Sequence, residues 1–380
     1  MLKTLHGEFE FKLQKYDLDG LSVSFLDLRQ PMPISYISRG LQELSVYYSN
    51  RMSYKEVARL IERYSGAKVL SAQTIWQLVQ QSALQVSNEI ERQVGQSLLQ
   101  TRPVEVTCEI NLDAADAEEV LLFDDGISVK AQKPERGKTF DLQERKISQP
   151  QIEYGKRVLT DVVVVQTAPG EFEYVSAPIA ADGSLRCSLV EVVQAKVQQV
   201  YGHRSLPLPL VVICDGASVI RQRWTQTFGK DVVIILDWYH LTKKLRNLMS
   251  MIASTKAEKL VHLKVLFTHL WQGQSGAAIN YLRQQVNPKN WEKWQELLTY
   301  LEKHKSEIIN YERRRQAGKS IGSGRVEKAV DQVIAQRQKH QGKSWRPQGS
   351  RALGLLKILE LNGRWHQFWF SQHLLDQPKF

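Results

Sequence analysis

The sequence predicts an α/β protein with a mixed β-sheet, a helical region before the sheet and an all-helical insertion late in the chain. Three observations predict this class. Short apolar runs rich in β-branched residues are confined to residues 103–242, where they later alternate with amphipathic stretches. Residues 36–100 carry only helical periodicity, and residues 243–318 contain no strand pattern. This order fits a layered α/β fold.

The helical region, residues 36–100, is predicted to contain three helices. The second would begin after Ser53, which has the capping-box spacing to Glu56, and would end at Gly66. Together with the third helix it resembles a helix-turn-helix, with 71–85 as the recognition helix. A plain helical hairpin has the same pattern, so DNA reading is one of two interpretations.

The sheet region is predicted to contain strands at 104–112, 118–126, 127–132, 156–167, 171–179, 208–215 and 231–237. Helices are predicted at 188–202 and 217–228. An Asp-Gly pair at 125–126 predicts a hairpin turn between the second and third strands. Residues 319–380 would return to the core with one more helix and a C-terminal tail. The same succession of elements is found in RNase H-like nucleases and integrases.

Three carboxylates stand at distinctive places in this pattern. Asp125 and Asp215 each end an apolar run and precede a glycine, and Glu327 lies on an amphipathic helix in the most basic part of the chain. Asp124 is the alternative to Asp125, but neighbouring strand residues face opposite sides, so only one can enter a site. Asp331 lies one helical turn beyond Glu327 and is the alternative there.

Acids that converge from two strand ends and a helix predict a site for divalent cations. Mg2+ prefers oxygen ligands, and two such ions can activate an attacking hydroxyl and stabilise the leaving oxygen of a phosphodiester. We therefore expect Asp125, Asp215 and Glu327 to be catalytic and to bind two Mg2+ ions, with Mn2+ as a possible substitute. An isolated Asp-Gly pair is more often a simple turn, so the prediction depends on the combination.

Asp237 and His240 lie three residues apart where a predicted strand meets a helix. The pair could bind a metal or a substrate phosphate, or Asp237 could simply cap the helix beside a half-buried histidine. We expect the pair to shape the active site.

Positive charge is concentrated in one part of the chain. The net charge is +11, and between residues 313 and 351 eleven Lys and Arg residues accompany only two acids. Such a concentration is typical of a surface that binds a polyphosphate, although a solvated basic face has the same composition. The residues expected to contact DNA are Arg325, Lys328, Arg337, Lys339, Lys343, Trp345 and Arg346. A core position is the other interpretation of Trp345.

The composition excludes several classes of protein. No apolar run approaches the roughly 20 residues that span a bilayer. The first residues lack the apolar core of a signal peptide, so we expect a cytoplasmic protein without a membrane partner. Three widely spaced cysteines argue against a disulfide framework or a structural zinc site.

The motifs FDDGISVK, ICDGASVI, LDWYHLTKKL and IGSGRVEKAV resemble bacterial insertion-sequence transposases of the ISKra-like group, which are related to Mutator-like Asp-Asp-Glu transposases. The resemblance covers roughly residues 36–360. It implies that Asp125, Asp215 and Glu327 are the three catalytic acids, that the Asp237–His240 pair is the signature after the second acid, and that 243–318 is the all-α insertion.

The resemblance implies cleavage of DNA and strand transfer into a target, with double-stranded DNA as partner and a homo-oligomer assembled on it. Relatives often carry a cysteine-rich zinc ribbon, whereas residues 1–35 suggest its strands without its cysteines. Either this module is degenerate or the chain lacks an N-terminal portion. Two other functions remain open, namely a structure-specific nuclease on the same core and a non-enzymatic DNA-binding protein derived from a transposase.

Overall fold

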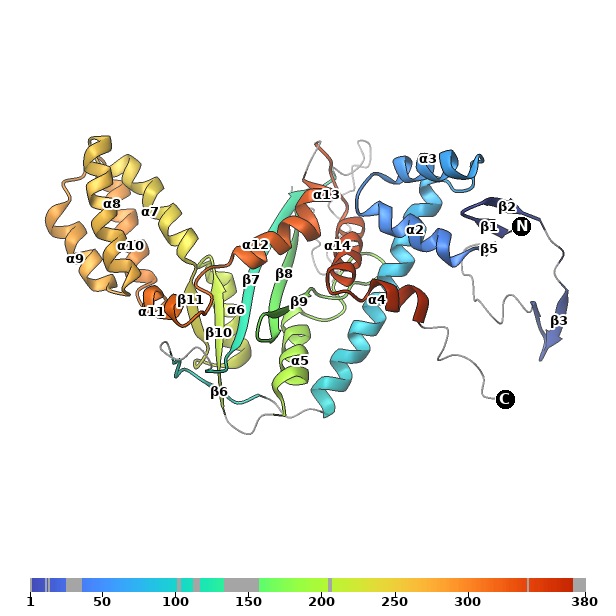
Figure 1. The fold of residues 1–380 in the computed structure, drawn as a ribbon, viewed down its shortest axis with the longest axis horizontal. Helices are drawn as coiled ribbons and strands as arrows, with labels where there is room; N and C mark the ends of the chain where they lie inside the picture. The colour runs from blue at the N-terminus through green and yellow to red at the C-terminus, as the bar shows by residue number, and fades with distance from the viewer. Residues whose placement is uncertain are drawn as a thin grey trace, which may run out of the picture.

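The centre of the protein is a mixed β-sheet with helices on both faces (Figure 1). The computed structural model describes residues 2–10, 12, 14–24, 36–100, 104–111, 117–132, 157–203, 207–339 and 342–371. The strand order is β11-β10-β7-β8-β9, and a short β6 also pairs with β10. These strands are β6 Val106–Thr107, β7 Val120–Lys130, β8 Arg157–Ala168, β9 Glu171–Val175, β10 Leu208–Cys214 and β11 Val233–Leu236.

The strands combine two pairing modes. β7, β8 and β9 form an antiparallel meander, and β10 and β11 then add in parallel on the other side of β7. Antiparallel strands do not require a crossover, whereas parallel strands do, and here helices precede both β10 and β11. The central strand β7 is buried on both faces by the two hydrophobic cores that cover the sheet, which explains its continuous apolar run from Val120 to Phe123.

One sequence prediction about β7 is wrong. No turn occurs at Asp125 and Gly126, and β7 continues as one strand to Lys130. Gly126 is paired with Asp161 of β8 as part of the regular ladder. A Cβ atom at position 126 would lie 2.7 Å from an oxygen of Asp161, so the glycine allows close packing here and does not form a turn. The strand predicted at 104–112 is also shorter, since β6 is the only strand among residues 104–111, the described part of that range.

Helices α5 and α6 cover one face of the sheet and pack together with the C-terminal half of α4. The other face is covered by α12, α14 and the start of α7, which share the larger hydrophobic core. The bounds are α4 Ala72–Gln100, α5 Leu189–Tyr201, α6 Ser218–Phe228, α7 Trp238–Ile252, α12 Gly324–Val330 and α14 Pro347–Leu361. The helices predicted between β9 and β11 are thus present.

Within its described residues, the N-terminal part contains a small three-stranded sheet, a separate strand pair and three helices. α3 begins with the predicted capping box of Ser53 and Glu56 and ends at Gly66 in the left-handed conformation. α4 is longer than predicted and runs from the N-terminal helices into the core, where it contacts α5 and α14. The elements are β1 Leu2–Thr4, β2 Gly7–Phe9, β3 Lys15–Leu18, β4 Leu21–Ser24, β5 Tyr36–Ile37, α2 Arg39–Ser49 and α3 Tyr54–Ser65.

The predicted helical insertion projects from the β11 side of the sheet, and the N-terminal helices lie on the other side (Figure 1). Among the described residues between β11 and α12, every regular element is a helix. Besides α7 these are α8 Lys256–Trp271, α9 Ser275–Gln285, α10 Trp291–Lys303 and α11 Tyr311–Gln316. α12 is followed directly by a π-helical turn, η1 Asp331–Ala335, then by α13 Gln336–Gln338, α14 and η2 Gln367–Ser371. None of the helices in these described ranges is long and apolar enough to cross a bilayer.

Candidate active site

Asp125 faces the side of the sheet that α12 covers. Its neighbours in strand alternation, Phe123 and Ile127, belong to the core on this side, and α12 packs on both β7 and β8. The parallel register pairs Ile213 of β10 with Phe123, so Asp215, two residues further on, continues the row beside Asp125. Adjacent strands lie about 4.8 Å apart, which brings the two carboxylates to neighbouring positions.

Asp215 lies in the turn between β10 and α6. Its Oδ1 accepts a hydrogen bond of 2.8 Å from the backbone N–H of Ala217, which orients the exposed carboxylate. Gly216 has a φ of +87°, and a Cβ atom there would lie 2.7 Å from the His304 ring. The turn therefore needs glycine both for its backbone conformation and for the close approach of the insertion.

Glu327 is positioned by the loop that leads into α12. Its backbone N–H donates to the carbonyl of Ser323, 3.0 Å away, and its side chain remains 38% exposed. Asp331 begins the π-helical turn after Glu327, is exposed, and accepts a hydrogen bond from Gln336. π-Helical turns often occur at functional sites because they shift the side chains that follow.

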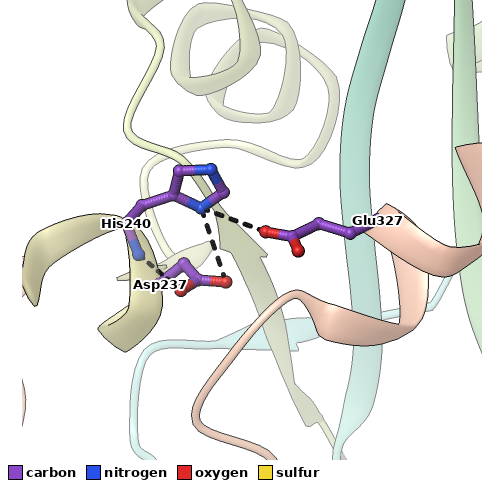
Figure 2. A group of neighbouring side chains, drawn as sticks. All are labelled: Asp237, His240 and Glu327. Carbon is purple, nitrogen blue, oxygen red and sulfur yellow. Dashed lines mark hydrogen bonds and ion pairs between the residues drawn. The ribbon is translucent and has the colours of Figure 1, made fainter. Parts of the chain in front are cut away.

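Figure 2 shows His240 of α7 and Glu327 of α12 pointing toward one another, with Asp237 beneath them. Nδ1 of His240 lies 3.6 Å from Oε1 of Glu327 and 3.7 Å from Oδ2 of Asp237. Asp237 caps α7, since its Oδ1 accepts from the backbone N–H of His240 at 3.0 Å. Ser323 donates to Oδ2 of Asp237 through both its backbone N–H and its hydroxyl. Asp237 is thus linked to the loop that leads into α12, the helix of Glu327.

The pKa shifts connect the acids into one electrostatic group. Burial raises the pKa of Asp125, and the negative charges of Asp215 and Glu327 add to this effect, while His240 opposes it. The Asp237 carboxylate raises the pKa of His240, again with contributions from Glu327 and Asp215. Burial would raise the pKa of Asp237, but the hydrogen bonds from His240 and Ser323 outweigh it and lower that pKa to about 2.

Carboxylates crowded in this way attract a cation. Asp237, His240 and Glu327 offer ligand atoms within 4.8 Å of one another. Asp237, however, is fully buried, and both of its oxygens already accept hydrogen bonds. Asp125 and Asp215 have mutual repulsion that a cation would relieve, and carboxylate oxygens are the ligands Mg2+ prefers. The carboxylates of Asp125, Asp215 and Glu327 thus influence one another electrostatically, but of the described residues only Asp237, His240 and Glu327 have ligand atoms within 4.8 Å of one another.

Asp124, the alternative acid, faces the opposite side of the sheet. Its carboxylate accepts hydrogen bonds from Arg223 at 2.9 Å and from the indole N–H of Trp224 at 2.7 Å. Burial raises its pKa to about 6 despite the opposing charge of Arg223. Arg223 also pairs with Asp161, so Asp124 belongs to a buried network that attaches α6 to β7 and β8.

The basic stretch is not one continuous surface, which corrects part of the sequence interpretation. Arg337 is buried, donates to the carbonyl of Ser49 and stacks over Trp345 at 4.9 Å. Trp345 is also buried and donates to the carbonyl of Gln338. Arg337 thus attaches α13 to the N-terminal helix α2, and Trp345 packs against α13, so both side chains are buried, contrary to the expectation that they contact DNA. The expected DNA contacts that are exposed are Arg325, Lys328, Lys339 and Arg346, while Lys343 is half-buried.

Sequence reasoning does not find the residues that support the acids. Arg314 is fully buried and forms a two-pronged pair with Glu119, directly before β7, while its Nε donates to the carbonyl of Ser320. It thereby ties the loop before α12 to the strand that carries Asp125. Glu119 and Arg314 are 195 positions apart. No local signal links such distant residues, and composition alone groups Arg314 with the surface charges.

No protein-family model matches this chain, and no curated protein matches it.

Proposed function

We propose that this protein is a DNA transposase of the Asp-Asp-Glu type, with an RNase H-like core and a likeness to the ISKra-like group. The observation that carries the proposal is the placement of three acids on one face of the sheet. Asp125 lies on the central strand β7, Asp215 follows the adjacent parallel strand β10, and Glu327 is on the helix that comes after the insertion.

The strand order supports the RNase H-like assignment. Three antiparallel strands in sequence, followed by two that add in parallel beside the first of them, give the arrangement expected of that fold. The position of the helical insertion between β11 and α12 also agrees with the transposase group, whose members carry an insertion before the glutamate. The same acids on a different strand topology would support a transposase less strongly.

In the proposed reaction, Asp125, Asp215 and Glu327 would hold two Mg2+ ions, or Mn2+ in their place. The bound ions would activate a water or a 3′-hydroxyl and stabilise the leaving oxygen of the phosphodiester. Asp237 fixes the start of α7 at His240 and secures the loop that leads into α12, the helix of Glu327. The His240 ring, whose pKa is raised, adds positive charge beside the three acids and is placed to contact a substrate phosphate.

The proposed substrate is double-stranded DNA, both at the element's ends and in the target, bound by a homo-oligomer. The exposed side chains around α12 provide positive charge next to the acids. At the start of α4 the polar side chains of Ser71, Gln73 and Gln77 are exposed, as a recognition helix requires. Element ends with inverted repeats beside the coding sequence would favour a transposase over a structure-specific nuclease on the same core.

The test is an Asp215→Asn variant of the full chain. The amide keeps the shape of the side chain but removes a metal-binding charge, so Mg2+-dependent cleavage of DNA should fall at least a hundredfold. DNA binding should persist, because the basic surface is unchanged. Cleavage measured on labelled duplex with Mg2+ and with Mn2+ provides the readout.

Asp331→Asn is the matched control, because this exposed aspartate lies one turn beyond Glu327 and outside the acid group. It should cleave like the wild type. Undiminished cleavage by Asp215→Asn, or equal loss in both variants, would contradict the metal site. Wild-type protein that binds DNA but never cleaves it would favour the non-enzymatic alternative.

A further inference from the structure

The outer face of α7 runs from the candidate active site along the helical insertion, and it is polar and positively charged. The exposed residues at helical spacing are Tyr239, Lys243, Arg246, Asn247 and Ser250, here called the α7 stripe. Tyr239 begins the stripe next to His240, and their rings lie 5.7 Å apart. A molecule bound to the acids would therefore meet the stripe as it leaves the site.

The charges of the stripe are uncompensated. Within the described residues neither Lys243 nor Arg246 forms an ion pair, and α7 contains no acidic residue after its cap. Lys243 instead lies 5.6 Å from the centre of the Tyr239 ring, and Arg246 lies over Phe267. Both cations are thus held at the surface by aromatic rings while their charge stays available.

The neighbouring face of α7 differs in this respect. Lys244 lines a groove of about 570 Å³ between α7 and α10, together with Trp291 and Lys303. Its ammonium group, however, pairs with Glu296 at 2.7 Å, and Glu292 lines the same groove. Positive charge is therefore balanced in the groove and unbalanced on the stripe, which favours the stripe as the surface for a polyanion.

We propose that the α7 stripe binds the DNA strand beside the scissile phosphate, with Tyr239 stacked on an unpaired base and Lys243 and Arg246 on the following phosphates. This inference rests on the proposed function. Tyr239 is 53% exposed, so its ring is available for stacking. Along the helix, Lys243 lies about 6 Å and Arg246 about 10 Å beyond Tyr239, at a rise of about 1.5 Å per residue. Successive nucleotides of an extended strand fit such a spacing.

The first experiment compares Lys243→Gln/Arg246→Gln with Lys244→Gln/Lys303→Gln, two variants of the full chain with the same loss of charge. Their affinity for a labelled duplex with a six-nucleotide unpaired tail is measured by anisotropy in EDTA at several salt concentrations. The stripe variant should bind more weakly, and its log–log salt slope should be shallower by up to about 0.9 for each phosphate that is no longer neutralised. The groove variant should keep the wild-type slope.

The second experiment tests stacking with Tyr239→Ala and Tyr239→Phe. Tyr239→Ala should bind the tailed probe about fivefold to a hundredfold more weakly than the wild type. Tyr239→Phe keeps the aromatic ring and should bind this probe like the wild type. Neither should change affinity for a blunt duplex.

A stripe variant with the wild-type slope would overturn the inference, as would an equal change in the groove variant. Because binding is measured in EDTA, these results do not depend on cleavage. Wild-type protein that binds neither probe would instead contradict the proposed function, on which the inference rests.

Discussion

The adjacent residues Asp124 and Asp125 of β7 have different surroundings because they face opposite sides of the sheet. Asp124 is 1% exposed and satisfied by Arg223 and Trp224, while Asp125 faces the acids on the other side. The alternation of side chains along a strand predicts that only one of them can enter a site, and in the structure the two side chains do face opposite sides of the sheet. The partners of Asp124 could not be predicted, because Arg223 and Trp224 are about a hundred positions away.

Asp237 gives a residue-scale prediction about pH. Its pKa of about 2 lies below the ordinary value of 3.8, so its ionised form stabilises the fold. That contribution is fully present above about pH 4 and is lost as the pH falls through about 2. Asp237→Asn should therefore lower the free energy of unfolding by about 2 kcal/mol at pH 7, since the amide cannot accept hydrogen bonds on both sides.

Urea unfolding of wild type and variant between pH 7 and pH 2.5 measures this difference. It should shrink as the pH falls below about 4, because the wild type then loses the same charge. Asp331→Asn, on an exposed side chain, should show no such trend. A wild-type advantage that stays constant over the whole range would contradict the role assigned to the Asp237 charge.

At the scale of elements, most helices and strands could be predicted because their signals are local. The capping box before α3, the β-branched run of β10 and the helical periodicity of the insertion are all short-range patterns. The hairpin predicted at Asp125 and Gly126 failed for a tertiary reason. Asp-Gly favours a turn when the chain is free, but here β8 pairs with β7 through Asp125 and Gly126 as far as Lys130 and keeps the strand extended.

The position of α12 depends on a contact that no local pattern shows. Arg314 is buried against Glu119 and fixes the loop before the helix. Arg314→Met should lower the free energy of unfolding by about 3 kcal/mol, because it leaves part of a buried carboxylate charge unpaired. The loss should lie at the low end of the usual range, since Lys319 still approaches Glu119 at 3.4 Å.

Thermal and urea unfolding of Arg314→Met test this anchoring, with Arg315→Met as the control. Arg315 is the next residue on α11 but is exposed, and its guanidinium lies 5.8 Å from the centre of the Trp271 ring. Its substitution should cost no more than about 1 kcal/mol. Similar losses for the two variants would mean that the pair with Glu119 does not anchor the loop.

At the scale of the whole molecule, the basic C-terminal stretch divides into two groups of side chains. Arg314, Arg337 and Trp345 are buried and connect distant elements, while Arg325, Lys328 and Lys339 remain exposed around α12. Sequence composition cannot separate these groups, because a buried arginine counts the same as an exposed one. The fold places the exposed group on the same side of the sheet as the acids, on α12 and at the end of α13.

The final prediction follows from this division. Neutralising Arg325, Lys328 and Lys339 together to Gln should weaken binding to all DNA sequences and flatten the log–log salt dependence by up to about 0.9 for each phosphate that these side chains neutralise. Arg337→Gln should instead lower the melting temperature by several degrees, since it removes the bond to Ser49 and the stack on Trp345, and should leave the salt slope unchanged. Anisotropy titrations over a salt series and melting curves for both variants separate the two effects. A flattened slope in a stably folded Arg337→Gln variant, or an unchanged slope in the triple variant, would show that the exposed and buried groups have been assigned the wrong way round.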